Sequence, residues 1–455
     1  MSKKVLLVLG AVTAALALGG CASYRALPLA DHAQLADRIG NIKHTLPAPT
    51  PGANPVPIDV DQPLSVDQIG LLAILNDPHL RTERGEFDLA KADLTLSALL
   101  PNPSVSLSYA ALLGGPGTTG AYTASLAQDV ASLVTYRSRV SSAKAHVSEV
   151  NAQLLWNEWQ VAQKARLLAV DLYWGERSIA LSAAELASLS REGANVRRAV
   201  DAGTMSLSEL GALQASQASA EHTLATMQLD QLKNWQDLDA LLGLKPGVTF
   251  AIAQPDVPSV PPNLEALIAS VPARRPDLVA LQLGYRSADE NVRAAILGQF
   301  PAFVLGGAWS ADTSDVRSAG PTATFDLPIF DRNQGQVAKT RATRRLLHEQ
   351  YQSRLDDSVS SILSLQARSV RVAQYLAQAR RSAVTAASQA DAAEAAYERN
   401  NVDQRTLTDY ETTALQRHLD VIDLERGLAQ ARIALALELG LGLPQARMAP
   451  LDSAR

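Results

Sequence analysis

Two long stretches of the chain follow a helical pattern and contain no proline. All 23 prolines lie outside residues 117–245 and 329–443. Because a proline in a helix interior costs about 3 kcal/mol or more, both stretches are predicted to be helical. Turn-forming residues break each of them once, at 201–204 and at 400–403. Each stretch therefore predicts a helical hairpin, with arms at 136–198 and 207–242 in the first half of the chain and at 333–399 and 407–439 in the second.

A pair of segments with two-residue alternation precedes each hairpin. In the first pair, apolar residues alternate with small polar ones over residues 105–113 and 122–126. In the second pair, residues 303–309 lead into a polar loop expected at 310–320, and the alternation returns over 323–327. This pattern is typical of transmembrane barrel strands, although a half-buried hairpin of a soluble protein gives it too. We predict strand pairs at 104–129 and 302–328.

The two halves of the chain repeat at an offset of about 200 residues. Asn76, Asp77 and Pro78 open a predicted short helix in the first half, and the run from Arg275 to Asp277 opens one in the second. The later matches keep the same order: Leu100 and Pro101 with Phe300 and Pro301, Leu207 and Leu210 with Leu407 and Tyr410, and Leu242, Gly243 and Leu244 with Leu439, Gly440 and Leu441. This order predicts one repeat at 64–250 and a second at 251–445.

Composition narrows the classes of function. Aromatic residues make up only 5% of the chain, and ten alanines fall within residues 377–396, so the helices are suited to close mutual packing rather than to a thick globular core. The formal net charge is −5, and no basic stripe indicates nucleic acid. One cysteine excludes an internal disulfide or a CxxC metal site. No set of residues indicates an enzyme, a metal site or a cofactor.

The N-terminus resembles a lipoprotein signal peptide. Lys3 and Lys4 precede an apolar run at 5–17, and Leu18, Gly19 and Gly20 lead to the only cysteine, Cys21. We therefore expect a signal peptide at 1–20, a lipidated Cys21, and an extended proline-rich strap over 21–63. An ordinary cleaved signal with a chance cysteine is the alternative. Residues 446–455 are expected to form a C-terminal tail.

Four strands are too few to close a membrane barrel, which needs about eight or more. Three copies of the chain would supply twelve. The predicted fold class is therefore mainly α with a small β part. Duplicated long helical hairpins would form a trimeric α-barrel, and four strands per chain would contribute to a shared twelve-stranded transmembrane β-barrel.

The ordered motifs resemble the outer-membrane factors of the TolC family, in the lipoprotein branch of OprM-like and NodT-like channels. The resemblance covers about residues 60–445 and is carried by the 18–21 box, the Arg274–Arg275–Pro276–Asp277 run, Phe300 with Pro301, the 327–331 run and the 439–441 run. It implies a homotrimeric export duct in the outer membrane, lipid-anchored and reaching into the periplasm. Its expected partners are a periplasmic adaptor and an inner-membrane pump of the RND class.

In this family the periplasmic gate lies at the hairpin tips. The resemblance thereby makes gate candidates of six residues: Asp201, Gly203, Asn401, Asp403, Arg405 and Asp409. Under three-fold symmetry, each acidic residue would form a ring of three charges. Solvated charges at a helix turn would give the same sequence.

Two alternatives to an efflux channel stay open at this point. A channel for type I secretion would share the same architecture. A lipid-tethered periplasmic adaptor or coiled-coil scaffold would carry one hairpin flanked by β-rich domains, so the duplication of strands and hairpins argues against it.

Overall fold

The computed structural model describes residues 24–46, 56–301 and 303–441. The expected signal peptide, Cys21 and the C-terminal tail lie outside these residues. The chain divides into two compact units, one ending at Leu35 and one beginning at Ala36. In the first unit, residues 24–35 form neither helix nor strand. All the elements described below belong to the second unit.

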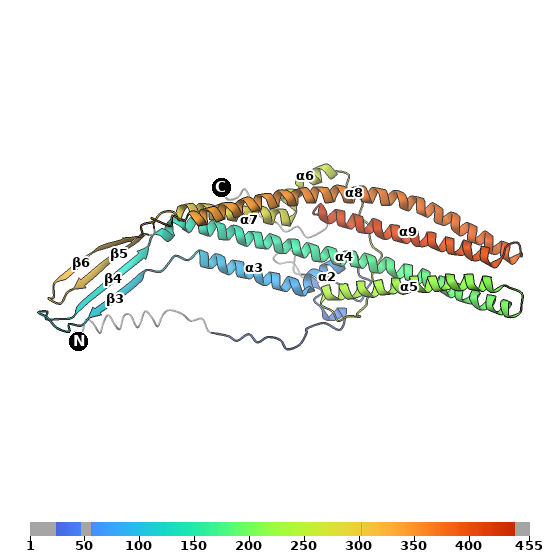
Figure 1. The fold of residues 1–455 in the computed structure, drawn as a ribbon, viewed down its shortest axis with the longest axis horizontal. Helices are drawn as coiled ribbons and strands as arrows, with labels where there is room; N and C mark the ends of the chain where they lie inside the picture. Colours follow the sequence, from blue (N-terminus) through green and yellow to red (C-terminus); the bar gives the residue numbers. More distant parts are fainter. Residues whose placement is uncertain (1–23, 47–55, 302, 442–455) are drawn as a thin grey trace. The chain divides into compact units, whose positions relative to one another are not determined.

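The element order repeats in the two halves of the chain (Figure 1). The first half contains α2 (Val66–Asn76), α3 (Pro78–Ser97), β3 (Ser104–Ala110), β4 (Ala121–Asp129), α4 (Ala131–Asp201) and α5 (Leu207–Leu242). The second half contains α6 (Leu264–Arg274), α7 (Pro276–Leu297), β5 (Phe303–Ala311), β6 (Arg317–Phe325), α8 (Gln334–Glu398) and α9 (Gln404–Glu438). The prediction of a mainly α chain with duplicated hairpins and four strands is confirmed.

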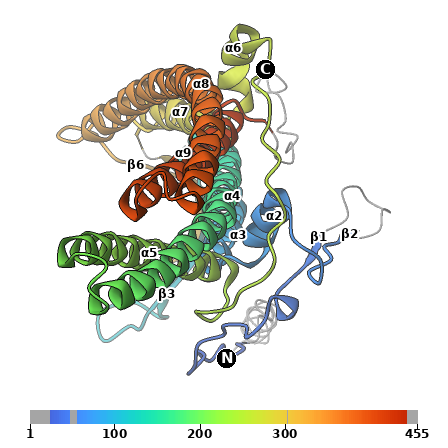
Figure 2. The ribbon, with the colours of Figure 1, turned by 90° about the vertical axis from the view of Figure 1, so that its right-hand side faces the viewer.

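The long helices form two hairpins. Helix α4 has 71 residues and returns as α5, and α8 has 65 residues and returns as α9. Viewed along their length, the α4–α5 and α8–α9 hairpins lie beside each other (Figure 2). Helix α7 packs against both α4 and α8 near the sheet, so it joins the long helices of the two halves. No helix within the described ranges is long and apolar enough to cross a membrane.

The short helices start where the sequence motifs predict. The Asp77 carboxylate accepts hydrogen bonds from the backbone N–H groups of His79 (2.7 Å) and Leu80 (3.0 Å), and Pro78 occupies the first helical position of α3. Proline is favoured there because its missing N–H has no helical partner to lose. In the second half, Pro276 takes the same place in α7, but Asp277 pairs with Arg275 instead of capping the helix.

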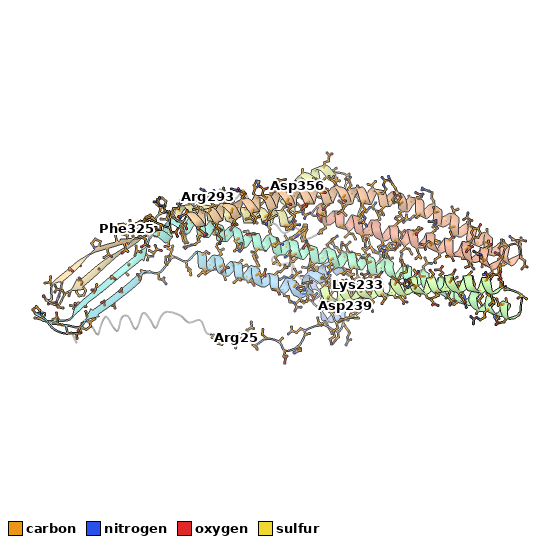
Figure 3. All side chains as sticks on the ribbon, viewed as in Figure 1. Arg25, Lys233, Asp239, Arg293, Phe325 and Asp356 are labelled. Carbon is orange, nitrogen blue, oxygen red and sulfur yellow. The ribbon has the colours of Figure 1, made fainter. Side chains whose placement is uncertain are left out.

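One antiparallel sheet contains all four long strands, in the order β3-β4-β5-β6. Tyr109 pairs with Tyr122, and Trp309 pairs with Ala124, so β3, β4 and β5 present these side chains on one face. That face is apolar and exposed, and its largest members include Val105, Leu107, Tyr109, Leu126, Leu305 and Trp309. Figure 3 places Phe325 where the sheet meets the helices.

The polar loop expected at 310–320 is wrong for most of its length. Strand β5 continues to Ala311 and β6 begins at Arg317, leaving a turn of residues 312–316. The Ser310 and Ser318 hydroxyls hydrogen-bond across the strands at 2.8 Å, so polar side chains here extend the sheet. The Asp312 carboxylate closes the turn by accepting from the backbone N–H of Val316 at 3.0 Å. In the first pair, β3 ends at Ala110, before residue 113.

The largest hydrophobic core lies midway along the hairpins. Ala169 and Leu172 of α4 pack there with Leu72 of α2, Leu242 of α5 and Ile433 of α9. A neighbouring cluster buries Trp156 and Trp159 with Ala162 and Leu437.

The chain before α2 also reaches this region. Ala36 donates its backbone N–H to Gly243 O at 3.0 Å, and Lys245 N–H donates to Ala36 O at 2.9 Å. Strands β1 (Thr45–Leu46) and β2 (Val56–Pro57) pair with each other. Within the expected strap, Ala36 therefore contacts the end of the first hairpin.

Candidate gate at the hairpin tips

The first tip joins α4 to α5 through a tight turn. Gly203 has φ +75°, a left-handed conformation that glycine adopts without steric cost. The Ser206 hydroxyl and the Glu209 side chain then cap α5 reciprocally: Glu209 N–H donates to Ser206 Oγ (3.3 Å), and Ser206 N–H donates to Glu209 Oε2 (2.8 Å). Asp201 ends α4 and is exposed. The turn is thus fixed by its own backbone and caps.

The second tip joins α8 to α9. Asn400, rather than its neighbour Asn401, takes the left-handed conformation, with φ 57°. Asn401 is exposed, and its backbone N–H donates to Ala396 O at 2.9 Å. Asp403 caps α9 by accepting from Thr406 N–H at 2.8 Å. This capping explains why a carboxylate stands at this position whether or not it acts on a passing solute.

The two tips meet at a small cavity of about 190 Å³. Arg405 and Asp409 of α9 line it together with Met205 and Glu209 from the first hairpin. Two of the six gate candidates therefore share one cavity. Asp201, Gly203 and Asn401 do not line it; they lie in the turns themselves.

Electrostatics link the two caps. Hydrogen bonds from the Ser206 backbone and hydroxyl lower the pKa of Glu209, whereas the negative charge of Asp403 opposes that shift. Hydrogen bonds from Thr406 lower the pKa of Asp403, and Arg405 lowers it further. Both carboxyl groups are therefore ionised at neutral pH, and Glu209 carries its negative charge into a cavity that Arg405 also lines.

A second carboxyl pair lies further from the tips, between the two hairpins. The Thr408 hydroxyl of α9 donates to Glu192 Oε2 of α4 at 3.0 Å. Glu411, one turn along α9, shares a hydrogen bond with Glu192. Burial, then Glu192, then the charge of Glu394 on α8 raise the pKa of Glu411 to about 7. Because two carboxylates share a hydrogen bond only while one holds a proton, this contact depends on pH near neutrality.

Sequence reasoning missed Glu192, Glu209 and Glu411. The serine-x-x-glutamate pattern of Ser206 and Glu209 is a capping signature and would have revealed Glu209. Glu192 and Glu411 lie on different hairpins, and no local pattern connects them. Within the described ranges, no group of three or more histidine, cysteine, aspartate or glutamate residues has the arrangement of a metal site.

Comparison with known proteins places this geometry in a family. The model of the family described as outer membrane efflux protein matches residues 267–441, from α6 through α9. The resemblance inferred from the motifs is confirmed, and the matched residues include the Arg275 motif and the second tip. A search of curated proteins finds no match.

Solved channel structures share the fold over the remainder of the chain. The outer-membrane channel OprN superposes with a TM-score of 0.69 at 15% identity, covering 93% of this chain and 99% of its own. VceC of Vibrio cholerae gives 0.68 at 17% identity, covering 83% and 96%. The open state of the MtrE channel of Neisseria gonorrhoeae gives 0.67 at 15% identity, covering 84% and 91%. The chain therefore has the fold of these channel structures in both repeats.

Proposed function

We propose that three copies of this chain assemble into a passive export channel of the outer membrane. The observation that carries the proposal is the four-stranded sheet. One of its faces exposes large apolar side chains, with Val105 66% and Tyr109 72% exposed. Its outer strands, β3 and β6, each have one edge without a partner strand in the sheet. An apolar face and two open edges are unfavourable in water.

Self-assembly would satisfy both features. If β6 of one copy pairs with β3 of the next, three copies close a sheet of twelve strands and no edge remains. The apolar face would then contact lipid. The helical hairpins would extend the channel into the periplasm, and the hairpin tips would form the periplasmic end of the channel. The efflux-family domain and the shared fold support this assembly.

The proposal also concerns the proteins with which the channel would work. We infer that the periplasmic end receives substrate from an inner-membrane pump, of the RND class, through a periplasmic adaptor, and that Cys21 carries the lipid anchor. The lipoprotein-like N-terminus supports this inference over a secretion channel. At the tips, we propose that three gate candidates interact with passing solute: Asp403, Arg405 and Asp409. The other three fix the conformation of the turns: Asp201, Gly203 and Asn401.

The test is the assembly state and conductance of the membrane-extracted protein. Native mass spectrometry of the detergent-solubilised chain should show three copies, and the same fraction should conduct ions in planar bilayers. A monomer that associates with membranes only through its acyl groups, and shows no conductance, would contradict the channel and favour a tethered scaffold.

A further inference from the structure

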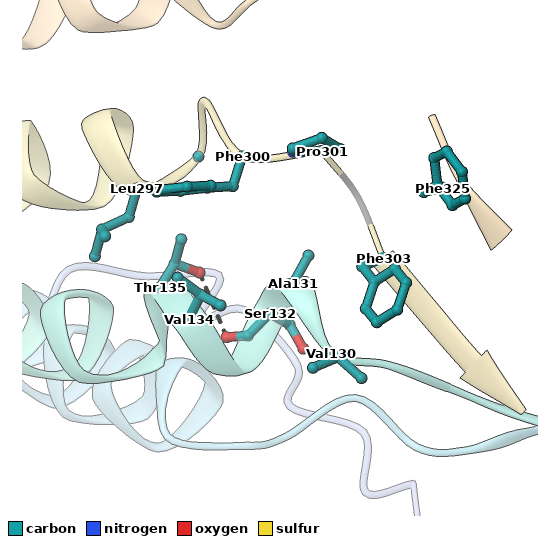
Figure 4. A pocket seen from close by; sticks show the side chains of 11 residues that line it. Val130, Ala131, Ser132, Val134, Thr135, Leu297, Phe300, Pro301, Phe303 and Phe325 are labelled. Atoms are coloured by element: carbon teal, nitrogen blue, oxygen red, sulfur yellow. Dashed lines mark hydrogen bonds between the residues drawn. The ribbon is translucent and has the colours of Figure 1, made fainter. Parts of the chain in front are cut away.

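Two cavities adjoin where the sheet meets the helices. The first has a volume of about 780 Å³ and is almost entirely apolar. Val134 of α4, Leu297 of α7 and Phe300 of the following loop form its helical side, and Phe303 and Phe325 form its strand side (Figure 4). Phe300 is 67% exposed and Phe325 is 58% exposed, so large apolar surface is left open here.

The second cavity has a volume of about 520 Å³ and a different chemistry. Two cations line it, Arg139 of α4 and Lys339 of α8, together with the polar side chains of Asn291, Asn333 and Thr340. None of its lining residues is acidic. The lining is therefore suited to an anion.

Arg139, which lines the second cavity, has guanidinium nitrogen atoms without hydrogen-bond partners among the described residues. These atoms, Nε and Nη2, are both buried. Buried polar groups normally have partners, and an unpaired guanidinium nitrogen is costly. Asp289 and Glu290 of α7 stand between the lining residues Ala288 and Asn291 in sequence, and both are already paired, Asp289 with Arg344 and Glu290 with Arg293. An anionic group in the cavity would supply what Arg139 lacks.

The two cavities are neighbours. Thr135 lines both of them. Gly298 lines the first, and a side chain there would approach the Asn333 amide nitrogen, which lines the second, to 2.9 Å. That amide is fixed because it donates to Ala295 O at 2.8 Å. The absence of a side chain at Gly298 therefore keeps the boundary between the cavities open.

The apolar cavity lies nearer the sheet, and the cationic cavity lies further along the helices. Phe303 and Phe325 are register partners and lie on the apolar face of the sheet, since Phe303 is two residues from Leu305. The apolar cavity is thus on the side that lipid would contact. Arg139 lies eight residues into α4 beyond Ala131, about 12 Å further from the sheet. From sheet to helices, the surface passes from apolar to cationic.

We propose that the adjoining cavities bind one anionic glycerophospholipid. An acyl chain would occupy the cavity at Val134, Phe303 and Phe325, and the phosphate would lie between Arg139 and Lys339. This orientation is that of a lipid in the leaflet facing the periplasm, and it rests on the proposed function. Helix α7 packs against both α4 and α8, and the lining residues of both cavities come from one chain.

The experiment measures lipid binding to the full-length, detergent-purified protein by native mass spectrometry. The probes are phosphatidylglycerol, phosphatidylcholine and inorganic phosphate. The test variant Arg139→Gln/Lys339→Gln removes both cations. Its matched control is Arg137→Gln/Arg341→Gln, which removes one exposed cation from each of the same two helices. A third variant, Val134→Phe, fills the apolar cavity without changing charge.

Phosphatidylglycerol should bind the wild type at least about tenfold more tightly than phosphatidylcholine. The Arg139→Gln/Lys339→Gln variant should lose that preference, whereas the control should stay within about twofold of the wild type. Val134→Phe should weaken phosphatidylglycerol but leave phosphate binding unchanged.

Equal affinities for the two lipids, or equal losses in the test and control variants, would overturn the proposal. Phosphate that fully displaces the lipid would show an anion site without a lipid tail. Trimer mass and conductance are recorded for every variant. A conducting trimer without lipid preference would refute only this inference. A monomer that still binds phosphatidylglycerol selectively would refute the channel and leave the lipid site standing.

Discussion

Replacing Arg275 with methionine should destabilise the protein by about 3 kcal/mol. Arg275 is 2% exposed, and its guanidinium donates to both carboxylate oxygens of Asp277, at 3.0 and 2.8 Å. It also pairs with Glu438 at the end of α9 and lies over the ring of Trp156 in α4, 4.5 Å from its centroid. Burial lowers the pKa of Arg275, but the two carboxylates outweigh this and raise it. The residue thus joins the two repeats as a cation.

The magnitude follows from what the substitution leaves behind. Methionine retains most of the packing on Trp156, so the loss is electrostatic. Removing one partner of a buried ion pair typically costs about 3–5 kcal/mol, because the other charge stays buried. Asp277 is 3% exposed, but Arg354 still approaches it at 3.4 Å, and Glu438 is partly solvated. These two features place the expected loss at the lower end, about 3 kcal/mol.

Urea unfolding of the detergent-solubilised protein, followed by tryptophan fluorescence at one fixed protein concentration, measures this loss. Trp156 reports directly on the site. The matched control is Arg293→Met, which removes a 62% exposed arginine that pairs with Asp289 and Glu290 at 3.1 Å. An exposed pair contributes less than about 1 kcal/mol. If Arg275→Met loses no more stability than Arg293→Met, the network does not join the repeats as argued.

Three further predictions concern the tips. Neutralising Asp403 and Asp409 together as asparagines should raise single-channel conductance in bilayers, with asparagine preserving the cap at 403; unchanged conductance would remove both from the gate. Because the pKa of Glu411 is raised to about 7, from 4.5, its contribution to the α4–α9 contact is present at low pH and is lost as pH rises through about 7. Hydrogen exchange of residues 404–411, corrected for intrinsic rates, should therefore be faster at pH 8 than at pH 6, and Glu411→Gln should abolish the difference. Gly203→Ala should destabilise the first tip by about 1 kcal/mol, seen as faster local proteolysis, and equal cleavage would contradict the strain argument.

Sequence patterns were sufficient for the elements because each has a local cause. Proline at the start of α3 and α7, glycine or asparagine at the tips, and two-residue alternation in the strands all act within a few residues. The predicted loop is too long because residues 310–320 are rich in serine and aspartate, which are typical of loops. Polar side chains on one face of a sheet give the same sequence pattern as a loop, and only the pairing of Ser310 with Ser318 distinguishes the two.

The chemistry between elements was beyond local patterns. The pairing of Glu192 with Glu411 joins residues more than 200 positions apart, and its effect on pKa requires burial that only the packed hairpins create. The Arg275 motif was visible in the sequence, but its partner Glu438 and the ring of Trp156 come from distant helices. Gate candidates were therefore located to the correct turns, while the residues that share a cavity emerged only from the fold.

The central position of the largest core has a mechanical consequence. That core holds α4 around Ala169 and Leu172, whereas α4 continues for about 30 residues, or roughly 45 Å, to the first tip at Asp201. A rod clamped at its middle pivots there. If α4 bends there, a small rotation becomes a displacement of several ångströms at the first tip. In the channel that we propose, opening at the tips would thereby be mechanically separated from sealing of the membrane at the sheet.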